Sequence, residues 1–188
     1  MESLKAKVFN RAASNPKNKP DEILKVLKLR QGQVVADIGA GGGYFSLRFA
    51  EIVGKKGRVF AVDTNQKFLE YIKNEAREKE LENVETIQAT GEKLDLPEKS
   101  LDLIFMRNVC HHLRNRVDYF RKLGHFLKTD GKVAIIERGK PLTLHGVFGH
   151  YVPRETIMKE MEEAGFIAKQ EFDFLPNQYF IIFVQKNA

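Results

Sequence analysis

The chain of 188 residues contains one cysteine, no tryptophan and no long run of apolar residues. The single thiol, Cys110, cannot form an intramolecular disulfide, and it excludes a metal site built from several cysteines. No apolar stretch approaches the ~18 to 20 residues that a membrane-spanning helix needs, and the first residues lack the apolar core of a secretory signal. These absences predict a cytoplasmic protein without a membrane span. The length and the 43% hydrophobic content predict one hydrophobic core.

Two nucleotide-binding signatures are missing from the glycine-rich stretch VVADIGAGGGYFSLRFA, Val34 to Ala50. No Gly-Lys-Ser/Thr triplet follows the glycines, which argues against a P-loop. Counted from Gly39, Tyr44 stands where the dinucleotide fingerprint needs its third glycine. The stretch does contain an apolar strand that runs into Gly39, Gly41 and Gly43 and then into an amphipathic helix. Glycines leave the backbone open to a flat ligand, so the stretch predicts a ligand-binding turn rather than a plain chain reversal.

The next apolar segment, RVFAVDTN, ends in an acid, Asp63. In nucleoside-binding α/β folds an acid at the tip of the second strand accepts hydrogen bonds from both ribose hydroxyls, because a carboxylate has two adjacent oxygens. The alternative role for Asp63 is to cap the helix that begins near Gln66. Asp37 is the single charge inside the first strand, and a carboxylate in that position needs a partner.

Alternating strand and helix signals predict an α/β fold. Helices are expected at about residues 21–29, 43–53, 66–80, 114–127 and 154–164, and strands at about 34–38, 58–63, 84–88, 101–106 and 132–137. Crossovers of this length join parallel neighbours. Two further strands, at about 167–174 and 179–185, are joined by Pro176 and Asn177 as a hairpin, so one of them must run antiparallel. Residues 1–19 are predicted to be an N-terminal arm or lid, followed by a single domain of residues 20–188.

Five segments resemble, in order and spacing, the motifs of class I S-adenosylmethionine-dependent methyltransferases, especially the small-molecule branch that includes the ubiquinone and menaquinone biosynthesis enzymes. They are DIGAGGG, the acid Asp63, ATGEKLDLP, LDLIFMRNVCHHL and GKVAIIE, within a match from about Ile23 to Val184. The resemblance implies a three-layer Rossmann-like fold with a seven-stranded, mostly parallel sheet of strand order 3-2-1-4-5-7-6 and one antiparallel strand. It also implies S-adenosyl-L-methionine as the cofactor and S-adenosyl-L-homocysteine as its product. The cofactor is then expected across the carboxyl ends of the strands, where the order reverses at the first strand.

The same resemblance assigns the contacts of the cofactor. It places the methionine end against Asp37 and the glycine turn, the ribose on Asp63, and the adenine near Thr64 and the loop after the third strand. In that loop Thr90 stands where the family often has the acid that receives the adenine amino group, and a hydroxyl accepts more weakly than a carboxylate. The expected cofactor-binding residues are Asp37, Gly39, Ala40, Gly41, Gly43, Asp63, Thr64, Gly91, Glu92, Arg107 and Asn108.

Histidines are expected to line the acceptor side. His111 and His112 follow the fourth strand directly, where family members place residues that border the methionine moiety and the substrate. His111 is favoured as the inward residue and as a base, because imidazole suits proton transfer near neutral pH; the alternative is that both histidines only support the loop. The segment ERGKPLTLHGVFGHYVPRE after the fifth strand is too long for a tight turn and is interpreted as a substrate-covering loop. The candidate catalytic residues are His111, His150 and Tyr151.

The histidines do not predict a metal site, because the spacing of His111, His145 and His150 fits no standard motif. A net charge of +6 raises the question of a nucleic-acid partner, but the lysines are scattered among glutamates, as on a solvated helix face, and do not favour one. The sequence therefore predicts a methyltransferase that acts on a small molecule by in-line displacement. An RNA or protein methyltransferase and a non-catalytic adenosyl-binding module are the alternatives. The acceptor and the oligomeric state stay undetermined.

Overall fold

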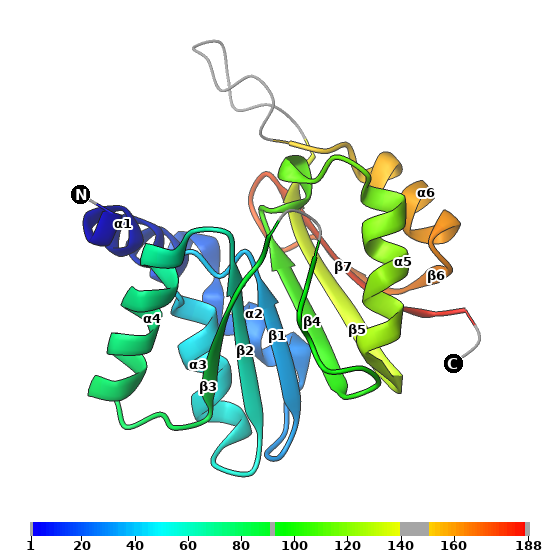
Figure 1. The fold of residues 1–188 in the computed structure, drawn as a ribbon. Helices are drawn as coiled ribbons and strands as arrows, with labels where there is room; N and C mark the ends of the chain where they lie inside the picture. Colours follow the sequence, from blue (N-terminus) through cyan, green and yellow to red (C-terminus); the bar gives the residue numbers. More distant parts are fainter. Residues whose placement is uncertain (1, 91–92, 140–150, 187–188) are drawn as a thin grey trace. The chain divides into compact units, whose positions relative to one another are not determined.

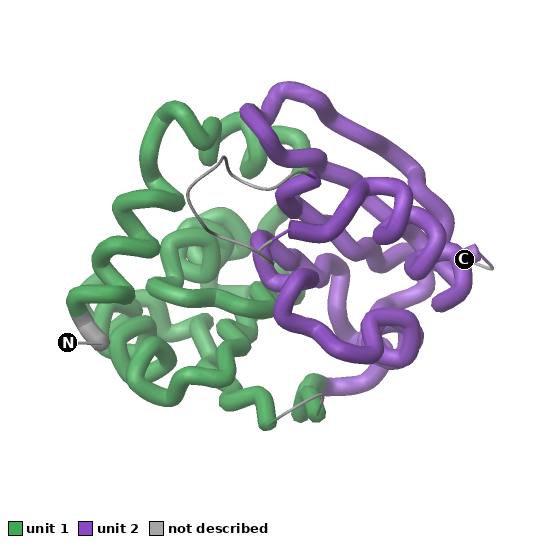
Figure 2. Tube along the Cα trace, turned by 90° about the horizontal axis from the view of Figure 1, so that it is seen from above, with its two compact units in different colours: residues 1–96 green, residues 97–188 purple. Residues whose placement is uncertain are grey.

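The computed structural model describes residues 2–90, 93–139 and 151–186 (Figure 1). The chain divides into two compact units, residues 1–96 and residues 97–188, which Figure 2 shows in different colours. Within the described ranges, no helix is long and apolar enough to cross a membrane.

The first unit contains a parallel sheet in which β2 (Arg58–Asp63) lies between β1 (Val34–Ile38) and β3 (Val84–Gln88). Its helices are α1 (Glu2–Ser14), α2 (Pro20–Leu27), α3 (Tyr44–Val53) and α4 (Gln66–Glu78), with a short 3-10 helix η1 (Pro16–Asn18). Strands β1 and β2 are almost entirely buried, as their apolar runs predict, and β3 is more exposed. The three strands are parallel, so their carboxyl ends lie at one edge of this unit.

Helix α4 shows why these segments fold as they do. Its buried residues, Phe68, Leu69, Ile72 and Ala76, recur every three or four positions, which gives the helix one apolar face. Leu69 and Ile72 pack with Ala61 of β2 in one buried cluster. The Asn65 side chain accepts the backbone N–H of Lys67 and so caps the start of the helix.

The second unit contains β4 (Leu101–Arg107), β5 (Leu127–Arg138), β6 (Phe166–Phe172) and β7 (Gln178–Gln185). Its helices are α5 (Arg116–Phe126), α6 (Arg154–Glu163) and the 3-10 helix η2 (Cys110–His112). Strands β4 and β5 are parallel, and β7 runs antiparallel to both β5 and β6. The strand order is β3-β2-β1-β4-β5-β7-β6. This order and the single antiparallel strand confirm the predicted fold class.

The N-terminal segment contains a helix that was not predicted, because residues Glu2–Ser14 form α1 within the predicted arm or lid. Ala6 is fully buried, and the Phe9 ring lies edge-on to Phe68 of α4, with 5.5 Å between ring centroids. The boundary at the start of α2 lies at Pro20, next to the expected one. A role of α1 as a lid stays a prediction.

Strand β5 is longer than expected, since it begins at Leu127 and not near residue 132. Helix α5 leads into this strand without a loop, and Leu127 pairs with Leu101 before a register shift between Leu101 and Leu103. Strand β5 is therefore longer than predicted because its first residue already pairs with the first residue of β4, ahead of the register shift.

Gly43 gives a test of the packing between the glycine turn and α4. It has a φ of +82°, and a Cβ built on it would stand 2.5 Å from Cγ1 of Ile72. We expect Gly43→Ala to lower the free energy of unfolding by the cost of a left-handed residue, about 1 kcal/mol, plus roughly 1 to 3 kcal/mol of overpacking.

Gly32 is a matched control for this substitution, since its φ is +83° and nothing lies within 4 Å of its Cβ position. Urea unfolding of Gly32→Ala measures the backbone cost alone, so Gly43→Ala must be clearly less stable than Gly32→Ala. Equal urea midpoints for the two variants would show that the Ile72 side chain moves aside with no loss of stability.

Candidate active site

Asp63, the last residue of β2, holds the glycine turn that follows β1. The Gly41 N–H donates to Oδ2 of Asp63 at 2.9 Å, and the Asn65 N–H donates to Oδ1 at 2.9 Å. Gly41 has a φ of +55°, a left-handed conformation that favours glycine. The carboxylate therefore fixes the shape of the turn.

The alternative role of Asp63, as the cap of α4, is filled by the Asn65 side chain. Each Asp63 oxygen accepts one backbone N–H from Gly41 or Asn65, whereas a carboxylate offers about four acceptor positions. The side chain is half-buried. Its chemistry therefore suits two further donors, such as a pair of ribose hydroxyls.

Asp37 has the buried partner that the sequence analysis required. It is 3% exposed, and the fully buried Ser46 of α3 donates its hydroxyl to Oδ2 of Asp37 at 2.6 Å. The hydrogen bond joins β1 to α3, the two elements between which the glycine turn lies in the chain. Ser46 was not identified from the sequence, although it lies on the helix that follows the glycines.

The other residues of the turn are held by backbone contacts. The N–H groups of Gly39 and Ala40 donate to the carbonyl of Val62 at 2.8 and 3.0 Å. Gly39 also has a left-handed conformation, with a φ of +75°. Gly43 is buried against Ile72, so packing onto α4 accounts for this glycine without a ligand.

Helix α1 lies directly on the glycine turn, which the sequence analysis did not predict. The Tyr44 N–H at the start of α3 donates to Oδ1 of Asn10 at 3.0 Å. A Cβ on Gly42 would stand 2.3 Å from the carbonyl oxygen of Ala6, and one on Gly41 would touch the Phe9 ring at 3.5 Å. The first amide of α3 is therefore bound by α1. Asn10 and Tyr44 are 34 positions apart, so no local pattern could have linked them.

The expected adenine contacts are only partly described. Thr64 is exposed, and its carbonyl accepts the side-chain amide of Gln88 at 3.3 Å. Thr90 forms an isolated bridge with Lys93. Gly91 and Glu92 lie outside the described residues. The adenine site therefore stays a prediction.

In the second unit, His111 forms a buried pair with Glu137. The His111 side chain is 7% exposed and the Glu137 side chain 0% exposed, with Nδ1 of His111 2.9 Å from Oε2 of Glu137. The neighbouring His112 is exposed, and the two imidazole centroids are 4.1 Å apart. His111 is thus the inward member of the pair. Glu137 is the first residue of the segment ERGKPLTLHGVFGHYVPRE that was predicted to cover the substrate, although it was not among the predicted catalytic residues.

Arg107 and Asn108 stand at the end of β4. The Asn108 N–H donates to the Ile136 carbonyl at 2.8 Å, and its Oδ1 accepts the side-chain amide of Gln178 at 2.6 Å. Asn108 has a left-handed φ of +54°, a conformation that asparagine tolerates better than most residues. The Nε and Nη1 atoms of Arg107 are buried. The hydrogen bond from Gln178 links the Asn108 side chain to β7.

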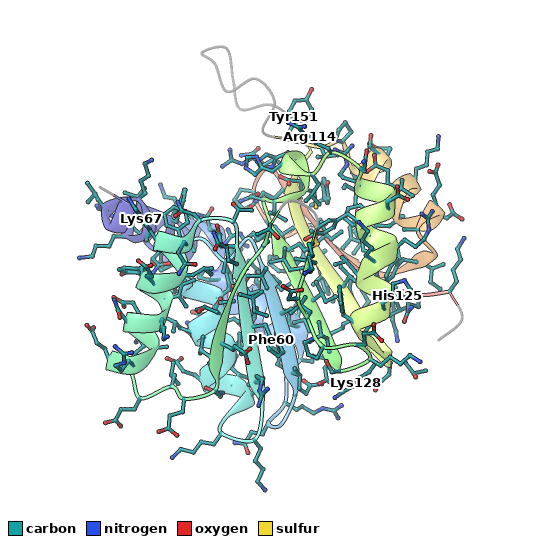
Figure 3. The ribbon with its side chains drawn as sticks, viewed as in Figure 1. Phe60, Lys67, Arg114, His125, Lys128 and Tyr151 are labelled. Carbon is teal, nitrogen blue, oxygen red and sulfur yellow. The ribbon has the colours of Figure 1, made fainter. Side chains whose placement is uncertain are left out.

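Tyr151 lies at the same end of the second unit as the ends of β4 and β5. Figure 3 shows Tyr151 and Arg114 at this end, with His125 and Lys128 toward the other end. The Val152 N–H donates to the Arg138 carbonyl at 3.0 Å, which returns the chain to the end of β5 next to Tyr151.

His145 and His150, two of the three histidines whose spacing fits no metal motif, lie outside the described residues. In the part of the chain that the structure describes, no group of three or more His, Cys, Asp or Glu residues could hold a metal ion. The catalytic assignment of His150 stays a prediction.

Cys110 of η2 and Tyr179 of β7 are buried near Glu137. Burial raises the pKa of the Cys110 thiol well above its ordinary value, and the Glu137 charge raises it further. Burial likewise raises the pKa of Tyr179, whose hydroxyl donates to the Val152 carbonyl at 3.1 Å. Both groups are therefore neutral across the physiological pH range.

The thiol gives a simple test of this environment. Because thiolate is the reactive form and Cys110 is 0% exposed, we expect a disulfide reagent at pH 8 to label the native protein about 100-fold more slowly than the unfolded protein. Absorbance of the released chromophore measures both rates. Cys110 is the only cysteine, so denatured protein in the same assay is an internal control for one thiol per chain. Rapid complete labelling of the native protein would contradict the buried position.

Known proteins are similar to this chain in sequence and in fold. A family profile described as "Methyltransferase domain" matches residues 29–174, and the chain belongs to this methyltransferase family. The uncharacterized methyltransferase YcgJ of Bacillus subtilis is 30% identical over 138 residues, which are 73% of this chain and 49% of the relative. The ubiquinone/menaquinone biosynthesis C-methyltransferase UbiE of Vibrio vulnificus is 31% identical over 114 residues, 60% of this chain and 44% of the relative.

Among solved structures, a SAM-dependent methyltransferase from Aquifex aeolicus superposes with a TM-score of 0.86 at 22% identity. The superposition covers 96% of this chain and 97% of the Aquifex chain. S-adenosyl-L-methionine is the cofactor that the family and this fold indicate. The chain spans about half the length of the curated relatives it matches, 49% of YcgJ and 44% of UbiE.

Proposed function

We propose that this protein transfers the methyl group of S-adenosyl-L-methionine to a small molecule whose acceptor atom loses a proton. The observation that supports the proposal is the buried pair of His111, in η2 after β4, and Glu137, near the end of β5, in a chain of the methyltransferase family. A buried imidazole held by a carboxylate is suited to remove a proton. The Vibrio relative is named a C-methyltransferase, and methylation at carbon also requires a proton to leave.

The residues of the glycine turn suit the cofactor. Bound S-adenosyl-L-methionine supplies an electrophilic methyl group on a positively charged sulfur. Asp63 has acceptor positions to spare for the ribose hydroxyls, and the turn it holds carries no side chain at Gly39 or Gly41. In the proposed arrangement, the backbone of this turn contacts the methionine end, as the family resemblance implies.

The acceptor side requires alignment and one proton transfer. In-line displacement depends mainly on the alignment of acceptor, methyl group and sulfur, so binding residues contribute the larger part of the rate. In the proposed reaction, His111 takes the proton from a hydroxyl or an acidic carbon of the acceptor. A general base of this kind contributes typically 10²- to 10⁴-fold. Tyr151, at the same end of the second unit, is proposed to contact the acceptor.

The first test identifies the class of acceptor. The protein is incubated with methyl-labelled S-adenosyl-L-methionine and cell extract separated into small-molecule, RNA and protein fractions. We expect label in the small-molecule fraction, and we expect His111→Gln to reduce it about 10²-fold or more, with S-adenosyl-L-homocysteine affinity unchanged. Label in RNA or protein would identify one of the alternative activities. Cofactor binding without any transfer would identify a non-catalytic module.

The second test concerns the ribose contact of Asp63. Asp63 also holds the turn, so loss of affinity in a variant is not by itself proof of a ribose contact. Calorimetry therefore compares S-adenosyl-L-homocysteine with its 2′-deoxyribose analogue on wild type and on Asp63→Asn. We expect wild type to prefer the natural ribose by about tenfold, since a hydrogen bond to a charged group contributes about 1.5 to 3 kcal/mol. Asp63→Asn should lose most of this preference.

Glu85→Gln is the control for this comparison, because Glu85 lies exposed on β3 of the same unit. It should keep the full preference for the natural ribose. If Asp63→Asn discriminates between the two ligands as well as wild type does, Asp63 does not bind the ribose.

A further inference from the structure

We infer that Glu137 is a positioning residue that keeps the proton of His111 on Nδ1 and so makes Nε2 the basic nitrogen. The catalytic consequence rests on the proposed function, in which His111 is the base. The tautomer itself depends only on the geometry of the second unit.

The first observation is the way in which Glu137 is held. Its Oε1 accepts the Arg138 N–H at 2.8 Å, and its Oε2 lies 3.4 Å from the His111 N–H and 2.9 Å from Nδ1 of His111. Two backbone amides, one at the end of β5 and one in η2, therefore fix the plane of the carboxylate. The oxygen that faces the imidazole cannot rotate away without loss of both contacts.

The second observation concerns the proton between the two side chains. A carboxylate can only accept hydrogen bonds, so the contact between Nδ1 of His111 and Glu137 requires a proton on Nδ1. In a neutral imidazole the other nitrogen, Nε2, then carries the lone pair. The Glu137 side chain is 0% exposed, so no water competes at this contact.

The third observation is the cost of the arrangement. A buried carboxylate is expensive unless its partners compensate for the lost hydration. A glutamine has one oxygen, which could accept the Arg138 N–H but would leave an NH₂ group facing both the N–H and Nδ1 of His111. An acid accepts on both oxygens, and its charge both holds the Nδ1 proton and stabilises the imidazolium that forms when Nε2 takes a second proton. This points to a role in proton transfer.

Glu137→Gln provides the decisive variant. The amide side chain introduced by this substitution would keep its oxygen on the Arg138 N–H, the shorter backbone contact, which turns the NH₂ group toward Nδ1 of His111. An NH₂ group can only donate, so Nδ1 must become the acceptor and the proton must move to Nε2. We therefore expect the variant to switch the tautomer of His111.

Nitrogen-15 NMR of histidine-labelled protein reads the tautomer without any substrate. The chain has five histidines, and His111→Gln assigns the signal of His111 by its loss. Wild type should show the Nδ1–H tautomer, and Glu137→Gln the Nε2–H tautomer. Glu160→Gln is the control, because it alters the Arg116–Glu160 ion pair between α5 and α6 and should leave the tautomer unchanged.

Steady-state kinetics then distinguishes a positioning role of Glu137 from a purely structural one. With the small-molecule fraction identified by the labelled-methyl assay, we expect Glu137→Gln to lower kcat by about 10²- to 10⁴-fold while KM and the affinity for S-adenosyl-L-homocysteine change by about twofold or less. Glu137→Asp keeps the charge but is shorter by one methylene, and it should recover part of the rate and the Nδ1–H tautomer.

The possible results separate the inference from the proposed function. An Nε2–H tautomer in wild type would overturn the inference with no variant needed, as would an unchanged tautomer in Glu137→Gln. A switched tautomer with a normal kcat would overturn the catalytic role of Glu137. If the tautomer switches but wild type transfers no methyl group to any fraction, the proposed function fails and the tautomer assignment stands.

Discussion

The hydrogen bonds to Asp63 are the interaction on which the glycine turn of the first unit depends. The carboxylate at the end of β2 accepts the N–H of Gly41 and the N–H of Asn65, so one side chain ties the glycine turn to the start of α4. Without it, the turn would have to satisfy a half-buried amide elsewhere, at a cost of about 1 to 3 kcal/mol. The same carboxylate has acceptor positions left over. An acid that organises the backbone is therefore also ready to bind a ligand.

Acids at the ends of parallel strands recur through the chain, and each has a local set of donors. Asp37 of β1 accepts the hydroxyl of Ser46, and Glu137 of β5 accepts the Arg138 amide and contacts the imidazole of His111. For Asp63 and Glu137 the strand end supplies backbone N–H groups, because the chain leaves the ladder there and these groups need other acceptors. Asp37 is buried and links β1 to α3. Asp63 has acceptor positions left for a ligand, and Glu137 faces an imidazole, which can take up and release a proton. The surroundings of each acid, more than its type, decide its role.

Much of the fold could be predicted from the sequence, because strands and helices alternate with clear periodicity. Strands β1, β2 and β3 have the bounds expected from their apolar runs. Helix α1 was not predicted, since Leu4 and Val8 are 66% and 56% exposed while the small Ala6 is buried. The pattern of large apolar residues in α1 therefore does not identify the side of the helix that packs against the rest of the unit. Helix α1 binds the Tyr44 amide through Asn10, so the surroundings of the glycine turn also differ from those expected.

The sequence by itself determined the order of the elements, the glycine turn and the positions of the acids, because these follow from local patterns of polarity and backbone freedom. Only the tertiary structure decided which donor each acid binds. Glu137 and His111 are 26 positions apart, and they meet because β4 and β5 pair in a register that sets Arg107 beside Ile136. A shift of this register by one residue would turn Glu137 to the opposite face of the strand, away from His111. Strand pairing is a property of the folded chain, and it alone converts separate residues into a site.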